Sequence, residues 1–163
     1  MAAHEDTEQI MAEEPIDPDV DLSVRRQRWE LRQGFWSIIT VVALGGAIGA
    51  VARYAIGMAW PTPPAEFPWA TLTINVAGCG LIGVMMVLIT DVWSAPRLVR
   101  PFLGTGVLGG FTTFSTYTVD VQRLITSGAP RTALVYLLIT PVSAMVAVGA
   151  AMILARLTVR SLR

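Results

Sequence analysis

Four long apolar stretches, separated by short polar links, dominate the pattern of this chain. They cover residues 36–60, 69–90, about 98–125 and about 132–155. Each stretch reaches the roughly 20 residues that an α-helix needs to cross a bilayer. The links are PTPPAEFP, DVWSAPR and TSGAPR, which are rich in proline and in polar residues. The pattern predicts an all-α membrane protein with four transmembrane helices.

Tryptophans mark the ends of the predicted spans, at Trp36, Trp60, Trp69 and Trp93. Amphipathic rings of this kind anchor at the boundary between lipid and water. The spans and their links account for nearly all of residues 34–163, so we expect one four-helix transmembrane domain there. Any function must then lie in the membrane, because no soluble domain remains to carry chemistry.

The segment before the spans has a different composition. Residues 1–24 are polar and acidic, which predicts a disordered tail. Residues 25–33, RRQRWELRQ, are basic and contain a tryptophan. They either approach anionic lipid headgroups or form a solvated helix end. We therefore divide the chain into 1–33, a tail plus juxtamembrane segment, and 34–163; the acidic start is unlike a secretory signal.

The charges are distributed unevenly, although the formal net charge is +0. Eight of the 12 acidic residues precede Leu22, and all 12 basic residues are Arg. From Leu22 onward, 12 Arg face 4 acidic residues, a net charge of +8. With four spans, nine Arg fall on the side of the termini and three on the other side. The positive-inside rule then predicts that both termini are cytoplasmic.

Several kinds of chemistry are excluded by composition. A single cysteine, Cys79, and a single histidine, His4, rule out an intrachain disulfide, a Cys or His metal site and a Ser-His-Asp triad. A G-x-G-x-x-G match runs through Gly104, Gly106 and Gly109, but a nucleotide site needs a preceding strand. We interpret this match as chance and expect a protein that is not an enzyme.

The third span contains an unusual stretch, GGFTTFSTYTVD, at residues 109–120. Its two glycines weaken a helix, and its Thr and Ser side chains compete for backbone groups. The stretch predicts a third helix that is broken at mid-membrane. A break there frees carbonyl groups, which is tolerable only inside protein or facing a cavity. Two such breaks meeting at a dimer axis could hold one Na⁺ through these carbonyls.

Aromatic rings lie between the hydroxyl groups of the same stretch. Phe114 and Tyr117 are three residues apart, so they share a face on a resumed helix. Ring edges carry partial positive charge. A row of ring edges and hydroxyl donors suits a small anion better than a cation. The alternative is a kinked packing helix with ordinary core aromatic residues.

The first span combines small residues with a charge. Gly45 and Gly49 are four residues apart, a spacing that lets helix backbones approach closely. Arg53 follows one turn later, and a cation in an apolar span needs water or a partner. It either attracts anions in a vestibule or extends its side chain to the interface.

Polar side chains in the second and fourth spans leave two interpretations open. Asn75 either donates its amide to an anion in a pore or forms a hydrogen bond between helices. Tyr136 and Thr140 are one turn apart, with Ser143 close by. They either line a polar track or satisfy carbonyls of their own helix.

Three segments, GGAIGAVARY, TLTINVAGCGLIG and GVLGGFTTFSTYTVD, resemble the Fluc (CrcB) family of fluoride channels. The resemblance covers residues 39–156. It implies a fluoride-selective channel in the cell membrane that exports F⁻ passively from the cytoplasm and so reduces fluoride toxicity. It also implies an antiparallel, dual-topology-type homodimer with two pores and one structural Na⁺. The partners would be fluoride, membrane lipid and a second subunit, and no nucleic acid.

The resemblance also implies roles for individual residues. Asn75 would be the pore amide, and Phe114 and Tyr117 would be the two rings of an aromatic ladder. Further positions would be Thr116, Tyr136 and Thr140 in the polar pathway, Arg53 in the vestibule, and Gly109 and Thr112 as carbonyl ligands of Na⁺.

The sequence departs from the family in three respects. Tyr117 stands where the second ring is usually Phe, and Ala144 stands where a hydroxyl is common. A dual-topology protein should also show little Arg bias, so the partner is either an identical chain or an oppositely oriented paralogue.

Two rival functions follow from the four-span pattern. A proton-coupled multidrug exporter needs a carboxylate within the membrane. Glu66 and Asp91 fall in links between spans and Asp120 falls at a span end, so we expect no carboxylate at mid-span for proton coupling. The other rival is a non-conducting membrane scaffold.

Overall fold

The computed structural model describes residues 25–92 and 96–161, with side chains from Phe35 onward. Every element in these ranges is a helix. The chain divides into two units, Met1–Ser37 and Ile38–Arg163. The described part of the first unit is the beginning of the first helix. The tail predicted to be disordered, residues 1–24, lies outside the described residues.

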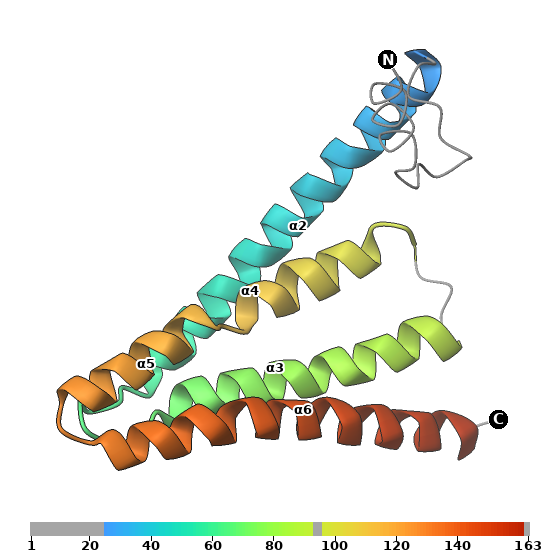
Figure 1. Ribbon diagram of the computed structural model, residues 1–163. Helices are drawn as coiled ribbons and strands as arrows, with labels where there is room; N and C mark the ends of the chain where they lie inside the picture. The colour runs from blue at the N-terminus through green and yellow to red at the C-terminus, as the bar shows by residue number, and fades with distance from the viewer. Residues whose placement is uncertain (1–24, 93–95, 162–163) are drawn as a thin grey trace, which may run out of the picture. The chain divides into compact units, whose positions relative to one another are not determined.

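Four helical stretches follow one another along the chain (Figure 1). The first is α2, and its backbone is already helical through the basic juxtamembrane segment. The second is α3, which continues into the π-helix η1. The third contains the π-helix η2, the single turn α4 and the helix α5, and the fourth is α6. Their bounds are α2 Arg25–Ala59, α3 Trp69–Val87, η1 Leu88–Val92, η2 Pro101–Leu108, α4 Gly109–Phe111, α5 Ser115–Thr126 and α6 Pro130–Ser161.

Three described helices are long and apolar enough to cross a membrane: Phe35–Ala59, Trp69–Val92 and Pro130–Ser161. They correspond to the first, second and fourth predicted spans. The third predicted span is helical but interrupted, because α4 ends at Phe111 and α5 begins only at Ser115. The four helical stretches and the interruption are confirmed. The depth of the break in a bilayer stays a prediction.

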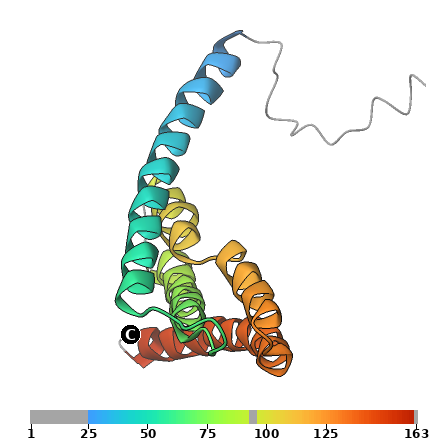
Figure 2. The ribbon, with the colours of Figure 1, turned by 90° about the vertical axis from the view of Figure 1, so that its left-hand side faces the viewer.

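Helix α6 is the main packing partner of helices α3 and α5 in the second unit. Helix α3 packs along α6, and α5 packs against the beginning of α6 (Figures 1 and 2). A small buried core lies where α5 and α6 meet, formed by Tyr117, Leu124, Ala133 and Tyr136. The turn between these two helices needs Gly128, whose φ is 79°, because other residues are strained in the left-handed region.

Glycines let α2 approach the third stretch closely. A Cβ at Gly45 would lie 2.5 Å from the Phe102 carbonyl oxygen, and one at Gly49 would overlap the Val107 carbonyl oxygen. Gly106 in turn lies against Gly45. The close packing predicted for Gly45 and Gly49 is therefore confirmed. Within the described ranges no strand precedes Gly104, which agrees with our interpretation of the G-x-G-x-x-G match as chance.

This contact predicts different effects for two neighbouring glycines. Gly49→Ala should lower the free energy of unfolding by about 1–3 kcal/mol, because backbone atoms of η2 and α4 would have to move. Gly46→Ala is the matched control, since a Cβ there meets nothing within 4 Å. Thermal unfolding of the purified variants in detergent measures both effects. Equal unfolding temperatures for the two variants would contradict the packing described here.

Candidate functional site

The break in the third stretch is held by an amide from another helix. Thr112 is extended, with φ −73° and ψ 157°, and so ends α4. The next residue, Thr113, donates its N–H to Asn75 Oδ1 at 2.8 Å. Asn75 Nδ2 in turn donates to the Thr113 carbonyl at 2.9 Å. One side chain of α3 thus replaces both helical hydrogen bonds of Thr113, as a buried backbone requires.

The Thr113 hydroxyl organises the start of α5. It accepts the N–H of Thr116 at 3.1 Å and donates to the Thr116 hydroxyl at 3.0 Å. In an uninterrupted helix the N–H groups of Thr113 and Thr116 would bond the carbonyls of Gly109 and Thr112. Here both N–H groups donate to side chains instead. Gly109 and Thr112 have therefore lost their usual helical donors.

Arg53 has a partner inside the protein. Its Nε donates to the Gly110 carbonyl at 3.2 Å, so α2 also contacts the broken segment. Arg53 borders an open groove of about 480 Å³ together with Thr71, Thr113 and Thr116. A guanidinium beside this groove gives it a positive potential. Two of the predicted site residues, Arg53 and Thr116, therefore lie together.

Four other predicted site residues border a second open groove, of about 410 Å³: Asn75, Phe114, Tyr117 and Thr140. Thr113 borders both grooves, so they adjoin at the break. The Thr140 side chain is buried, and its hydroxyl lies close to that of Tyr136, although no hydrogen bond of good geometry joins it to a described residue. Asn75 both joins two helices and borders this groove, so its two sequence interpretations coexist.

Aromatic rings continue behind this groove. The centroids of Phe114 and Tyr117 are 5.6 Å apart, and those of Tyr117 and Tyr136 are 5.3 Å apart. Phe114 is 79% exposed, whereas Tyr136 is fully buried. Tyr136 is not among the described residues that border either groove. Tyr136 is thus buried behind residues that border the groove, whereas Phe114 borders the groove and is exposed.

The fourth helix gives mixed results for the predicted polar track. Ser143 donates to carbonyls of its own helix, Ile139 at 2.7 Å and Thr140 at 3.0 Å. Ala144 borders the second groove without any polar side-chain atom. Beyond Thr140, the track therefore continues along an apolar wall.

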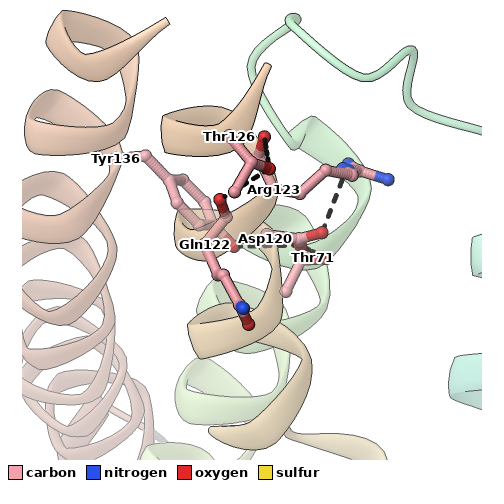
Figure 3. Close-up of polar contacts among 6 residues, drawn as sticks. All are labelled: Thr71, Asp120, Gln122, Arg123, Thr126 and Tyr136. Atoms are coloured by element: carbon pink, nitrogen blue, oxygen red, sulfur yellow. Dashed lines mark hydrogen bonds and ion pairs between the residues drawn. The ribbon is translucent and has the colours of Figure 1, made fainter. Parts of the chain in front are cut away.

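A buried carboxylate, Asp120, was missed as a site residue by the sequence analysis. Its Oδ2 accepts hydrogen bonds from Thr71 at 2.7 Å and from Tyr136 at 3.4 Å (Figure 3). Its Oδ1 forms an ion pair with Arg123 at 3.2 Å. Asp120 is only 6% exposed and connects α3, α5 and α6. Asp120 is therefore buried inside the protein, and its position at a span end stays a prediction.

One signal for this network was present in the sequence. A carboxylate in an apolar stretch is expensive unless paired, and Arg123 follows Asp120 by three residues, on the same helix face. The contribution of Thr71 and Tyr136 could not be inferred. Both come from other helices, 49 and 16 residues away in sequence.

Comparison with known proteins agrees with the resemblance of the sequence. A family model described as "CrcB-like protein, Camphor Resistance (CrcB)" matches residues 40–152. A Streptomyces avermitilis protein named Fluoride-specific ion channel FluC 2 is 61% identical over 116 residues, 71% of this chain and 72% of the relative. Fluoride-specific ion channel FluC 1 of Streptomyces coelicolor is 59% identical over 111 residues, 68% of this chain and 72% of the relative. A Nocardia farcinica protein, Fluoride-specific ion channel FluC 2, is 52% identical over 112 residues, 69% of this chain and 80% of the relative.

The Asp120 network predicts that a neutral amide cannot replace the carboxylate. In Asp120→Asn, the ion pair with Arg123 is lost, and the single amide oxygen can no longer accept from Arg123 on one side and from the Thr71 and Tyr136 hydroxyls on the other. We expect a loss of about 1–3 kcal/mol of unfolding free energy, measured by thermal unfolding in detergent. The control is Asp91→Asn, because Asp91 and Arg156 form an exposed pair at 3.8 Å, worth about 0–1 kcal/mol. Similar losses in both variants would refute the importance of this network.

Proposed function

This chain belongs to the CrcB family, and we propose that it is a fluoride-selective channel through which F⁻ leaves the cytoplasm passively. The observation that carries the proposal is the second groove. The amide of Asn75, the hydroxyl of Thr140 and the rings of Phe114 and Tyr117 border one path. All four are neutral groups that can direct hydrogen-bond donors or ring edges at an anion.

Neutral donors suit the chemistry of fluoride. The ion is small and strongly hydrated, so a selective path must replace its water ligands almost one for one. A fixed cation on the path would trap the ion, whereas conduction needs binding that is strong enough for entry and weak enough for exit. The Thr140 hydroxyl supports this role, because it is a buried donor that borders the second groove. Arg53 would act earlier, by attracting anions to the adjoining groove.

A second copy of the chain would complete the path. The groove is not enclosed, and Phe114, which borders it, is 79% exposed. An anion cannot cross a bilayer along a surface that faces lipid. We therefore infer an antiparallel dimer, in which each subunit covers the groove of the other and two pores result. The Arg bias favours cytoplasmic termini for this chain, and an oppositely oriented paralogue is the alternative partner.

The carbonyls at the break support a Na⁺ ion at the dimer axis. Gly109 and Thr112, the two expected ligands, are the residues whose helical donors are diverted to side chains. Hard cations take oxygen ligands, and backbone carbonyls serve in such sites. The ion would supply the positive charge that holds two broken segments together. The pore itself would be lined by neutral donors.

Reconstituted protein tests the channel directly. Liposomes loaded with KF and containing the purified chain should release fluoride to an electrode once valinomycin compensates the charge. Asn75→Ala and Phe114→Ile should each lower the flux by about tenfold, because Asn75→Ala removes an amide donor and Phe114→Ile removes a ring edge. Ser143→Ala is the control and should conduct normally, since Ser143 bonds its own helix.

The same assay separates the rivals. A scaffold gives no flux, and an exporter that uses Asp120 gives a flux that follows the proton gradient. Normal flux in both the Asn75 and the Phe114 variants would remove the second groove as the path.

Dimer stability tests the Na⁺ and the partner. The purified chain should run as a dimer in detergent, and its dissociation temperature should fall when Na⁺ is replaced by N-methylglucamine, because the facing carbonyls would lose their cation. Size-exclusion chromatography after heating measures this change, with K⁺ as a control for ionic strength. A Na⁺-independent dimer would contradict the cation site. A chain that remains monomeric by itself would contradict the homodimer and favour the paralogue.

A further inference from the structure

Helix α6 contains a proline that leaves one of its carbonyls without the usual donor. Pro141 lies inside the helix and has no N–H group. In a regular helix, residue 141 would donate to the carbonyl of Leu137. The hydroxyl of Tyr117, on α5, donates to this carbonyl at 2.6 Å. A side chain of one helix thus supplies the hydrogen bond that the neighbouring helix lacks.

The position of this carbonyl gives the bond a consequence for an anion. Leu137, Pro141 and Tyr117 border the second groove, together with Asn75 and Thr140. A carbonyl oxygen without a donor would carry its negative dipole into a path that must attract F⁻. It would also be an unsatisfied polar group within a membrane protein, which is costly.

We propose that Tyr117 is a positioning residue whose hydroxyl caps the carbonyl exposed by Pro141 and so removes this source of negative potential from the wall of the anion path. The expected effect on fluoride flux rests on the proposed function, whereas the hydrogen bond from Tyr117 to Leu137 does not. A phenol has a single proton, and here it is engaged with Leu137. The Tyr117 hydroxyl is therefore not a ligand of fluoride, and only its ring faces the ion.

This pairing accounts for one departure from the family. A Phe ring at position 117 would leave the Leu137 carbonyl uncapped as long as residue 141 is proline. Tyr117 and Pro141 therefore form a matched pair, because the Tyr117 hydroxyl supplies the hydrogen bond that Pro141 cannot donate to Leu137. A hydroxyl that served as a direct fluoride donor would have no such dependence on residue 141.

A double-mutant cycle distinguishes the two roles. The variants are Tyr117→Phe, Pro141→Ala and the combination, in the full-length chain. Tyr117→Phe alone should lower fluoride efflux about tenfold and lower the unfolding temperature. Pro141→Ala restores an N–H for Leu137, so Tyr117→Phe should have little further effect on efflux or on unfolding in that background. Pro141→Val, which also restores the N–H, replaces the Ala variant if the latter does not fold.

A second proline provides the matched control. Pro130 is the first residue of α6, where a missing N–H strands no carbonyl. In a Pro130→Ala background, Tyr117→Phe should keep its full effect. Equal effects of Tyr117→Phe in the parent chain and in the Pro141→Ala background would overturn the proposal, as would an unchanged unfolding temperature in the single variant. If the parent chain conducts no fluoride, the proposed function fails, while the unfolding cycle still decides whether the cap exists.

Discussion

The exchange of two hydrogen bonds between Asn75 and the backbone of Thr113 is the interaction on which the rest of this structure depends. Within a membrane protein, each backbone polar group that leaves a helix must find another partner. Asn75 satisfies both the N–H and the C=O of Thr113, at 2.8 and 2.9 Å. The chain can therefore stop one helix at Phe111 and start another at Ser115. Without this amide, both the N–H and the C=O of Thr113 would lose their partner.

Each of the other three stretches contributes a contact at or next to the break. Arg53 of α2 donates to the Gly110 carbonyl, and Asn75 of α3 holds Thr113. In the third contact the third stretch is the donor, because Tyr117 of α5 donates to the Leu137 carbonyl of α6. Small residues make these contacts possible, since Gly49 lets α2 lie directly against the broken segment. Contacts from several helices therefore hold the broken segment in place.

The charged side chains discussed above lie away from the second groove, whereas neutral polar side chains border it. The carboxylate of Asp120 is matched by Arg123 and by the hydroxyls of Thr71 and Tyr136, and it does not border the second groove. The second groove is bordered by an amide, a hydroxyl and rings, with no charged side chain among its lining residues. Arg53 belongs to the adjoining groove. On a path that runs from the first groove to the second, Arg53 would attract an anion, and the neutral donors would then pass it along.

The sequence by itself determined the four helical stretches, the close packing of Gly45 and Gly49, and the interruption among the hydroxyl residues after Gly110. These features are local, since they follow from hydrophobic length, small-residue spacing and competition for backbone groups. Only the tertiary structure decided that Asn75 bonds Thr113, that Asp120 is buried, and that Tyr117 reaches Leu137. Each of these features depends on contacts between different helical stretches, and the way helices rotate and slide against one another depends on packing that no single segment encodes.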